Sequence, residues 1–367
     1  MSNTYGNNLK LRIFGGSHDD VIGMTLEGFP SGVELFEDEL LGFMSRRAPG
    51  QNAWSTKRKE PDVPVFESGV TKSVKDGKNI YVTDGSPIRA VIYNTNQHSK
   101  DYSNLLDIPR PSHADFAARM KFGDSVDLRG GGKYSGRLTA PLCIAGALCL
   151  SFLKSKGITV GAHISSIGSV FDDRYDAVNV DENMLKEISA KAFPVINDGA
   201  GERMKEEIEA ARMSCDSVGG SVECAIVGLG VGLGDHPFDG VVGRFSAIVF
   251  SIPAVKGLEF GDGFDICNRR GSQNNDPYYT DGRVIRTSTN HNGGIIGGMS
   301  NGMPIIFRAA MKPTPSISIE QDSVSISKME NEKLIIKGRH DPCIVPRAVP
   351  VFEAAAAIAL TDAILDD

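Results

Sequence analysis

The stretch Leu128-Arg-Gly-Gly-Gly-Lys-Tyr-Ser-Gly-Arg137 leads into a long apolar, alanine-rich run, Ala140–Lys156. Its apolar centre, Leu142–Leu153, is shorter than the roughly 18 residues that a membrane span needs, and a serine interrupts it. We therefore expect a helix in the core of a globular protein. A second run of the same character, Val351–Ile364, predicts another core helix near the C-terminus.

The remaining patterns predict helices and strands that do not alternate regularly. The expected helices are Glu37–Arg47, Ser112–Lys121, Ala140–Lys156, Glu182–Phe193, Gly199–Met213 and Val349–Leu365. The expected strands are Leu9–Phe14, Ile158–Ser165, Val222–Leu229, Phe245–Ile252, Pro304–Met311 and Lys333–Lys337. Because stacked βαβ units would alternate, this order favours an α+β architecture over a doubly wound parallel sheet. No stretch resembles a flexible linker, so we expect one large domain over residues 1–367.

The composition is that of an ordinary globular protein, with 41% hydrophobic and 23% charged residues among 367. The net charge of −7 argues against bulk binding of nucleic acid. The N-terminus, Met1-Ser-Asn-Thr-Tyr-Gly-Asn-Asn8, lacks the charged start and apolar run of a secretory signal. The six cysteines stand singly, without a CxxC pair, which indicates reduced thiols, no metal site and a cytoplasmic location.

Two motifs each place a histidine directly after a serine. They are Phe14-Gly-Gly-Ser17-His18-Asp-Asp20 and Pro109-Arg-Pro-Ser112-His113-Ala-Asp115. Histidine suits proton transfer near neutral pH, and glycines before Ser17 expose the side chains that follow a strand. Ser112 is placed to cap a helix, which would put His113 in the first turn.

The glycine-rich stretch Leu128–Arg137 also carries three cationic side chains, Arg129, Lys133 and Arg137. Backbone N–H groups and a following helix can hold an anion such as phosphate. This is not a P-loop, because Asp127 and Tyr134 stand where that motif requires glycine and Ser or Thr.

Two further motifs combine polar side chains with a rigid backbone, Met311-Lys-Pro-Thr-Pro-Ser-Ile317 and Lys337-Gly-Arg-His-Asp-Pro-Cys343. The prolines of the first fix an extended loop that presents donors to a phosphate or a ring carbonyl. The charges of the second are either exposed or part of a site. Taken singly, each motif also fits a structural role, such as a polar loop, a helix cap or a strand exit.

Together, in this order, the motifs resemble the chorismate synthase family over almost the whole chain. The strings that carry the resemblance are Gly15-Gly-Ser-His18, Arg110-Pro-Ser-His-Ala-Asp115, Val255-Lys-Gly-Leu-Glu-Phe-Gly-Asp-Gly-Phe264, Arg270-Gly-Ser-Gln-Asn274, His291-Asn-Gly-Gly-Ile-Ile-Gly-Gly298, Lys312-Pro-Thr-Pro-Ser316 and Gly338-Arg-His-Asp-Pro-Cys343. The resemblance implies a sandwich of antiparallel sheets flanked by helices, and a homotetramer. It also implies a 1,4-anti elimination that converts 5-enolpyruvylshikimate 3-phosphate to chorismate and phosphate. That reaction requires reduced flavin mononucleotide (FMN), without net redox change.

The resemblance implies roles for residues at matching positions. Those assigned to substrate anions or as hydroxyl donors are Ser17, Arg47, Arg110, Ser135, Arg137 and Arg339. His18 would protonate the leaving phosphate, His113 would hydrogen-bond the reduced flavin, and Asp341 would accept a proton from the flavin N5 region. The positions that match flavin contacts are Lys133, Tyr134, Ser135, Pro253, Ala254, Gly297, Lys312, Pro313, Thr314, Pro315, Ser316 and Arg339.

The chain departs from the family pattern in three places. The first motif has Gly16 and Asp19 where Glu and Gly are usual, which would retune the pKa of His18. Two arginines are missing from the loop after Arg46-Arg47, at Ala48 and Ala53. The flavin loop has Lys133 and Tyr134 in place of Arg and Ser. Because His18, His113, Arg137, Arg339 and Asp341 all remain, we expect an active enzyme with shifted affinity. The alternatives are a flavin-binding relative that acts on another phosphorylated acid and a non-catalytic flavin-binding protein.

The source of reduced flavin divides the family, because some members use a reduced nicotinamide cofactor and others are supplied with reduced flavin. This chain has no G-x-G-x-x-G fingerprint. Gly228-Leu-Gly-Val-Gly-Leu-Gly234 instead predicts a strand with one all-glycine face. We therefore expect supplied reduced FMN, with NADPH as a candidate reductant, and no nucleic-acid or membrane partner.

Overall fold

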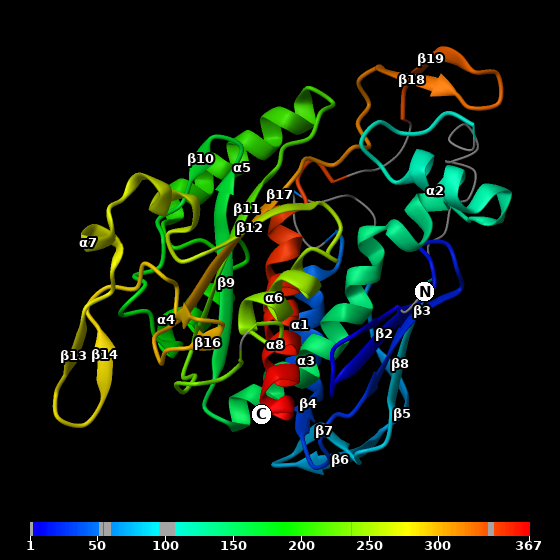
Figure 1. The fold of residues 1–367 in the computed structure, drawn as a ribbon. Coiled ribbons are helices and arrows are strands. Elements are labelled where there is room, and N and C mark those ends of the chain that lie inside the picture. The colour runs from blue at the N-terminus through cyan, green and yellow to red at the C-terminus, as the bar shows by residue number, and fades with distance from the viewer. Residues whose placement is uncertain (1–2, 51–53, 55–59, 95–106, 236, 337–340) are drawn as a thin grey trace.

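Two five-stranded antiparallel sheets form the frame of the molecule (Figure 1). The computed structural model describes residues 3–50, 54, 60–94, 107–235, 237–336 and 341–367. The first sheet has the order β1 (Thr4–Tyr5), β2 (Lys10–Phe14), β3 (Val21–Glu27), β8 (Ile88–Tyr93), β5 (Val65–Ser68). The second has the order β10 (Val170–Phe171), β9 (Thr159–Ile167), β11 (Gly220–Val227), β17 (Ile305–Met311), β12 (Val255–Phe260).

Three helices lie between the two sheets: α1 (Glu37–Arg47), α3 (Thr139–Ser155) and α8 (Val345–Asp366). Helix α3 packs against β3 and β8 of the first sheet, α8 packs against β9 and β11 of the second, and the two helices pack against each other. A Cβ atom on Gly146 would stand 2.2 Å from the Cβ of Ala354, so glycine is what lets α3 and α8 approach so closely.

Helices α3 and α8 are apolar on nearly every side, as expected for helices surrounded by protein. They are long and apolar enough to cross a membrane, but most of each lies buried inside the fold. One buried cluster runs from Leu9 to Ala363 and includes residues of both sheets and of both helices. The layer of helices is therefore the common core of the two sheets.

The smaller elements lie around this frame. The other helices are α2 (Asp115–Phe122), α4 (Glu182–Ser189), α5 (Asp198–Met213), α6 (Val241–Val249) and α7 (Gly271–Asn274). The other strands are β4 (Glu34–Phe36), β6 (Val70–Lys75), β7 (Lys78–Thr83), β13 (Tyr278–Thr280), β14 (Ile285–Thr287), β15 (Ile295–Ile296), β16 (Met299–Ser300), β18 (Gln321–Ser325) and β19 (Glu330–Leu334).

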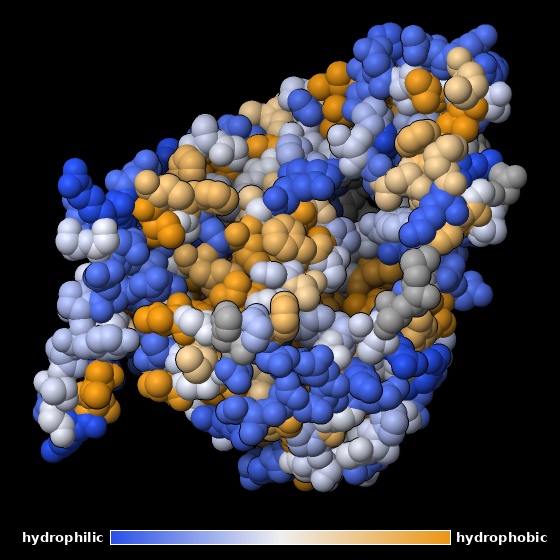
Figure 2. Space-filling model, viewed as in Figure 1, coloured by the Kyte–Doolittle hydropathy of each residue, from blue (hydrophilic) through white to orange (hydrophobic). Residues whose placement is uncertain are grey.

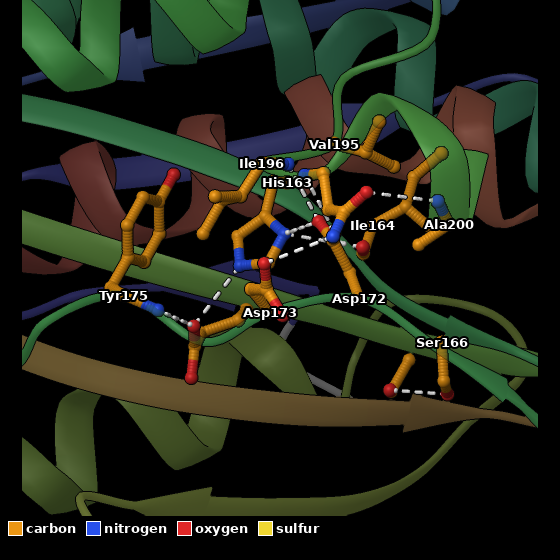
Figure 3. Close-up of polar contacts among 12 residues, drawn as sticks. His163, Ile164, Ser166, Asp172, Asp173, Tyr175, Val195, Ile196 and Ala200 are labelled. Carbon is orange, nitrogen blue, oxygen red and sulfur yellow. Dashed lines mark hydrogen bonds and ion pairs between the residues drawn. The ribbon is translucent and has the colours of Figure 1, made fainter.

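A row of charged side chains crosses the second sheet on the face away from α8. His163 of β9 pairs in register with Glu223 of β11, which pairs with Arg308 of β17, which pairs with Glu259 of β12. His163 is fully buried and contacts two carboxylates, Asp172 through Nδ1 at 2.9 Å and Glu223 through Nε2 at 3.0 Å (Figure 3). The pKa of His163 is raised, because these hydrogen bonds outweigh the effect of burial.

The predicted α+β class with antiparallel sheets is confirmed. The resemblance places the helices on the flanks, but α1, α3 and α8 lie between the sheets, and the other helices lie around this frame. The apolar α3 and α8 lie inside because they must be covered on both sides. The strand predicted over Phe245–Ile252 is wrong. Phe245–Val249 forms the second half of α6, which buries Val241, Phe245 and Ile248 at helical spacing, and residues 250–252 form the turn that follows. Residues 228–234 form turns beyond the end of β11, with one isolated bridge from Val231 to Asn301, so the all-glycine strand is also wrong.

Candidate active site

A cavity of about 580 Å³ opens where the C-terminal end of α1, the glycine-rich segment before α3 and the N-terminal end of α8 meet. Residues 250–256 and 311–316 complete its wall. Figure 2 shows the surface hollowed beside α2. Among the described residues, seven Lys or Arg side chains line it, against two acidic ones, Glu60 and Asp341. A strongly cationic cavity in a chain of net charge −7 indicates a site for anionic ligands.

Asp62 joins two of these cations on one wall. Its fully buried carboxylate forms ion pairs with Arg47, the last residue of α1, and with Arg137. Arg137 also donates to the side-chain oxygen of Asn94, at 3.1 and 3.0 Å. Burial by itself raises the pKa of Asp62, but the charges of Arg47 and Arg137 outweigh it and hold the pKa below its usual value.

Three consecutive glycines cover the first histidine motif. Gly130, Gly131 and Gly132 have φ angles of +57°, +90° and +52°, and the backbone N–H of Ser17 donates to the carbonyl of Gly132 at 3.1 Å. A Cβ on Gly130 would stand 2.3 Å from Cε1 of His18 and 2.8 Å from Oγ of Ser17. The glycines therefore allow the backbone to lie directly against these two side chains.

The second histidine motif converges on one carboxylate. Asp115 accepts from Arg110 Nε at 2.6 Å and lies 2.6 Å from His113 Nδ1. Arg110 also donates to Ser316 Oγ at 3.2 Å, which ties the motif to the 311–316 segment. The predicted helix start at Ser112 is wrong: Ser112 has φ +58°, and α2 begins at Asp115, so His113 precedes the helix.

The opposite wall carries Lys256 and Lys312. Burial, and then the charge of Lys256, lower the pKa of Lys312. Nearby, the hydroxyl oxygen of Thr314 is buried and has no hydrogen-bond partner among the described residues. At the N-terminal end of α8, Arg347 forms an ion pair with Asp341 and donates from Nε to the carbonyl oxygen of Arg47 at 3.0 Å.

A family model for chorismate synthase matches residues 9–365. Chorismate synthase from Lancefieldella parvula is 42% identical over 99% of this chain and 96% of that protein. The enzyme from Methanobrevibacter smithii is 43% identical, with the same coverage of both chains. The chain belongs to the chorismate synthase family. A crystal structure of chorismate synthase, 29% identical over 98% of this chain and 93% of that one, superimposes with a TM-score of 0.74.

Chorismate synthase is a carbon–oxygen lyase of aromatic amino acid biosynthesis, and it uses reduced FMN. The residues present fit that cofactor. The orphaned hydroxyl of Thr314 and the two facing lysines suit a phosphate group, and Gly131, where a Cβ would stand 3.3 Å from Nε2 of His113, leaves room for a flat ring.

Most residues that the chorismate synthase resemblance singles out line this one cavity. They are Ser17, Arg47, Arg110, His113, Lys133, Tyr134, Ser135, Arg137, Pro253, Ala254, Lys312, Thr314, Pro315, Ser316 and Asp341. His18 is buried behind Gly130 and does not line it, and neither does Pro313. Gly297 lies away from it, in the turn between β15 and β16. Arg339 lies outside the described residues.

Arg129, which was predicted among the cations of the anion site, is half-exposed and pairs with Asp127. The following contacts concern the positions where the chain departs from the chorismate synthase pattern. The Asp19 carboxylate lies 3.4 Å from where a Cβ on Gly16 would stand, so an acidic group occupies the space beside residue 16. Lys133 Nζ lies 4.0 Å from the centroid of the Phe122 ring. Ala53 lies outside the described residues.

Sequence reasoning assigned no role to Asp62, Lys256 or Arg347, although all three lie at or directly behind the cavity wall. Asp62 stands in a turn-rich stretch with nothing to distinguish it from other acidic loop residues. The sequence did contain a signal that could have identified Arg347, because it is the one charged residue in the apolar segment 344–352. A charge in a helix that is otherwise buried needs a partner.

Proposed function

We propose that this cavity binds 5-enolpyruvylshikimate 3-phosphate beside reduced FMN and that the chain eliminates phosphate there, with 1,4-anti geometry, to give chorismate. The observation that carries the proposal is the excess of cationic over acidic side chains on the wall. Both ligands are anions, and the substrate alone bears two carboxylates and a phosphate. Arginine pairs with such groups through two parallel hydrogen bonds, which fixes orientation as well as charge.

The substrate contacts proposed here are the guanidinium groups of Arg47, Arg110 and Arg137, with Ser17 and Ser135 as hydroxyl donors. Arg339 completes this set by resemblance. Arg47 and Arg137 are held by one carboxylate and Arg110 by another, so their directions are fixed before a ligand arrives. Such preorganisation lowers the cost of orienting the substrate.

Two side chains are proposed to handle protons. His18, which follows Ser17 and lies against Gly130, supplies a proton to the leaving phosphate. Asp341 accepts a proton on the other side of the reaction, and Arg347 holds its carboxylate. His113 hydrogen-bonds the flavin.

The flavin-binding set proposed is Lys133, Tyr134, Ser135, Pro253, Ala254, Lys312, Thr314, Pro315 and Ser316, which line the cavity. Gly297, Pro313 and Arg339 are added to the set by resemblance alone. Reduced FMN supplies, when bound, the electron-rich ring that assists C–H and C–O cleavage. The protein residues hold its phosphate, exclude water and fix its ring. The rigid Pro313 and Pro315 keep the hydroxyls of Thr314 and Ser316 in place.

An anaerobic assay tests the proposal. The purified chain is mixed with 5-enolpyruvylshikimate 3-phosphate and chemically reduced FMN, and chorismate absorbance and phosphate release are followed together. Equal amounts of both products are expected. Tight flavin binding with neither product would overturn the proposal and favour a relative that acts on another phosphorylated acid.

On the family resemblance we also propose that the chain is one domain over residues 1–367 and works as a cytoplasmic homotetramer supplied with reduced FMN. Light scattering during gel filtration should give four times the chain mass. An aerobic assay with NADPH and oxidised FMN should give no chorismate unless a separate flavin reductase is added.

A further inference from the structure

Asp115 is a buried carboxylate beside the cavity that contacts two of the side chains lining it. It is the first residue of α2, and its side chain is 3% exposed. It accepts from Arg110 through the backbone N–H at 3.2 Å, Nε at 2.6 Å and Nη2 at 2.8 Å. Its Oδ1 also lies 2.6 Å from Nδ1 of His113. Both cationic side chains line the cavity, and one carboxylate therefore fixes both.

These contacts decide which nitrogen of His113 carries the proton. Burial alone would raise the pKa of Asp115, but its hydrogen bonds to Arg110 and His113 lower it, so the side chain is an ionised carboxylate at neutral pH. An ionised carboxylate can only accept hydrogen bonds. The 2.6 Å contact therefore requires Nδ1 of His113 to be the donor.

The guanidinium of Arg110 competes for the same nitrogen. Its Nη2 lies 3.1 Å from Nδ1 of His113 and could donate only to a bare Nδ1, which would leave two acceptors, Nδ1 and the ionised carboxylate, 2.6 Å apart. The shorter contact with the carboxylate therefore favours Nδ1–H, and Nη2 of Arg110 donates to Oδ1 of Asp115. Both nitrogens are held in place by the Oδ1 atom that they share. Nε2 is then the free end of the ring, and it lies on the side of Gly131, where a Cβ would stand 3.3 Å away.

We propose that Asp115 is a positioning residue that fixes His113 as the Nδ1–H tautomer and fixes the direction of Arg110. Any proton that His113 gives or takes then moves at Nε2, the nitrogen beside Gly131. The same carboxylate couples the histidine proposed for the flavin to an arginine proposed for the substrate. The assignment of those two ligands rests on the proposed function, whereas the tautomer does not.

The first experiment observes the tautomer directly, without ligand or turnover. The imidazole nitrogens are labelled with ¹⁵N, and their shifts are recorded near neutral pH in the wild-type protein and in Asp115→Asn. His113→Asn identifies which of the seven histidine signals belongs to His113. The expected wild-type signal has a protonated Nδ1 and a bare Nε2. A wild-type ring with its proton on Nε2 would overturn the proposal.

Asp115→Asn should disturb the tautomer, because its amide N–H₂ can donate to Nδ1 and push the proton to Nε2. Turnover should fall by about 10²-fold or more, the range expected when a proton-handling group is misplaced. KM for the substrate should rise as Arg110 loosens. Asp115→Glu keeps the charge and should recover part of both losses. Asp38→Asn, the same change in an exposed pair with Lys78, should alter neither quantity.

A double-mutant cycle separates positioning from a general structural role. His113→Asn keeps a side-chain N–H for Asp115 but removes Nε2, so adding Asp115→Asn to it should cost little further kcat. Losses that multiply fully would show that Asp115 does not act through His113. If the wild-type chain makes no chorismate, the proposed function fails, while the ¹⁵N shifts still decide the tautomer.

Discussion

Asp341 is the single residue whose replacement tests the proposed chemistry most directly. It lies on the cavity wall, and its carboxylate is paired with Arg347. Asp341→Asn keeps the size of the side chain but removes its capacity to take a proton. We expect kcat to fall by about 10²- to 10⁴-fold, with flavin affinity nearly unchanged. Anaerobic turnover and a flavin titration measure the two effects, and an unchanged kcat would remove Asp341 from the mechanism.

Asp62 is the residue with the largest expected effect on stability. Removing one partner of a buried ion pair costs about 3–5 kcal/mol, because the other charge stays buried. Asp62→Asn leaves Arg47 and Arg137 facing each other, so the free energy of unfolding should fall by about that amount at pH 7. KM for the substrate should rise. Asp322→Asn, in an exposed pair with Lys333, is the matched control and should change stability by well under about 1 kcal/mol.

The sign of the pH dependence follows from the lowered pKa of Asp62. A carboxyl whose pKa is lower in the folded state stabilises the protein above its unfolded pKa, about 3.9. That stability is lost as the pH falls through the lower folded value. Urea unfolding between about pH 5 and the acid limit should therefore show a steeper loss in the wild type than in Asp62→Asn. Equal slopes would contradict the ion pairs.

The residue types of the motifs and their order in the chain predicted most residues of the candidate site. His113, Arg137, Lys312 and Asp341 come from motifs far apart in the chain, yet they line one cavity. What the sequence could not indicate was which charges pair with one another. Arg129 and Arg137 flank the same glycines, but Arg137 is buried against Asp62 and Arg129 pairs with Asp127 at the surface. Burial of a charge depends on tertiary partners, which local sequence does not encode.

At the level of elements, the glycine-rich turn before α3 is held by a close contact that a single methyl group would break. Gly130→Ala would place a Cβ 2.3 Å from His18, in addition to the strain of φ +57°. We expect turnover to fall at least about 10²-fold, because His18 must move. Gly123→Ala is the control: it has φ +61° but open space around it, and so it carries the strain alone. Similar kcat values in the two variants would contradict the contact.

The charged row on the second sheet makes the stability of β9 depend on pH in the opposite sense to Asp62. The pKa of His163 is raised in the folded state, so its contribution is fully present below the unfolded value of about 6.5. The contribution is lost as the pH rises through the folded value. Asp172 also accepts from the backbone N–H of Ile196 at 2.6 Å and of Asn197 at 2.9 Å, so the pair ties a loop to the strand (Figure 3).

His163→Gln keeps polar groups in place but cannot become charged. The wild type should lose stability between about pH 6.5 and the folded pKa, while the variant should show a flatter profile over that interval. Chemical unfolding at several pH values measures the difference. Parallel profiles for the two proteins would show that His163 is not protonated in the folded state.

Long elements with a clear pattern were predicted well, and short apolar runs were not. Glu37–Arg47 matches α1 residue for residue, helped by its acidic first turn and basic last turn. Phe245–Ile252 was misread because Val, Ile and Phe in a short run suit a buried strand and a buried helix equally. The packing of Phe245 against Phe260 and Phe307, both on strands, decides between them only in three dimensions.

For the whole molecule, the contact between α3 and α8 sets how far apart the two sheets lie. Gly146→Leu would force a side chain into a place where even a Cβ comes within 2.2 Å of Ala354. We expect a loss of at least about 2 kcal/mol and a lower Tm. Gly42→Ala, at an exposed helical glycine with open space around it, is the control and should stabilise by about 0.5–1 kcal/mol. Equal Tm values for the two variants would contradict the close packing.

The fold class followed from the order of elements, but the layer order did not. Ala140–Lys156 and Val351–Ile364 were identified as core helices because they are apolar and alanine-rich. Hydropathy says that such helices are covered, but it does not say by what. That both sheets cover the same pair of helices follows from one buried cluster, which includes residues as distant in the chain as Leu11 and Phe352.

The position of α8 has a consequence for how the chain is made. Helix α8 follows every strand of the two sheets in the chain and is therefore synthesised after them, yet it fills the space between the sheets. Until then the face of the second sheet that packs on α8, and the side of α3 that contacts α8, have no partner. A chain stopped short of Val345 would expose these apolar surfaces to chaperones, proteases and other nascent chains. The core thus closes only when α8 has been made, so quality control can distinguish a chain truncated before α8 from one that contains it by the exposed apolar surface.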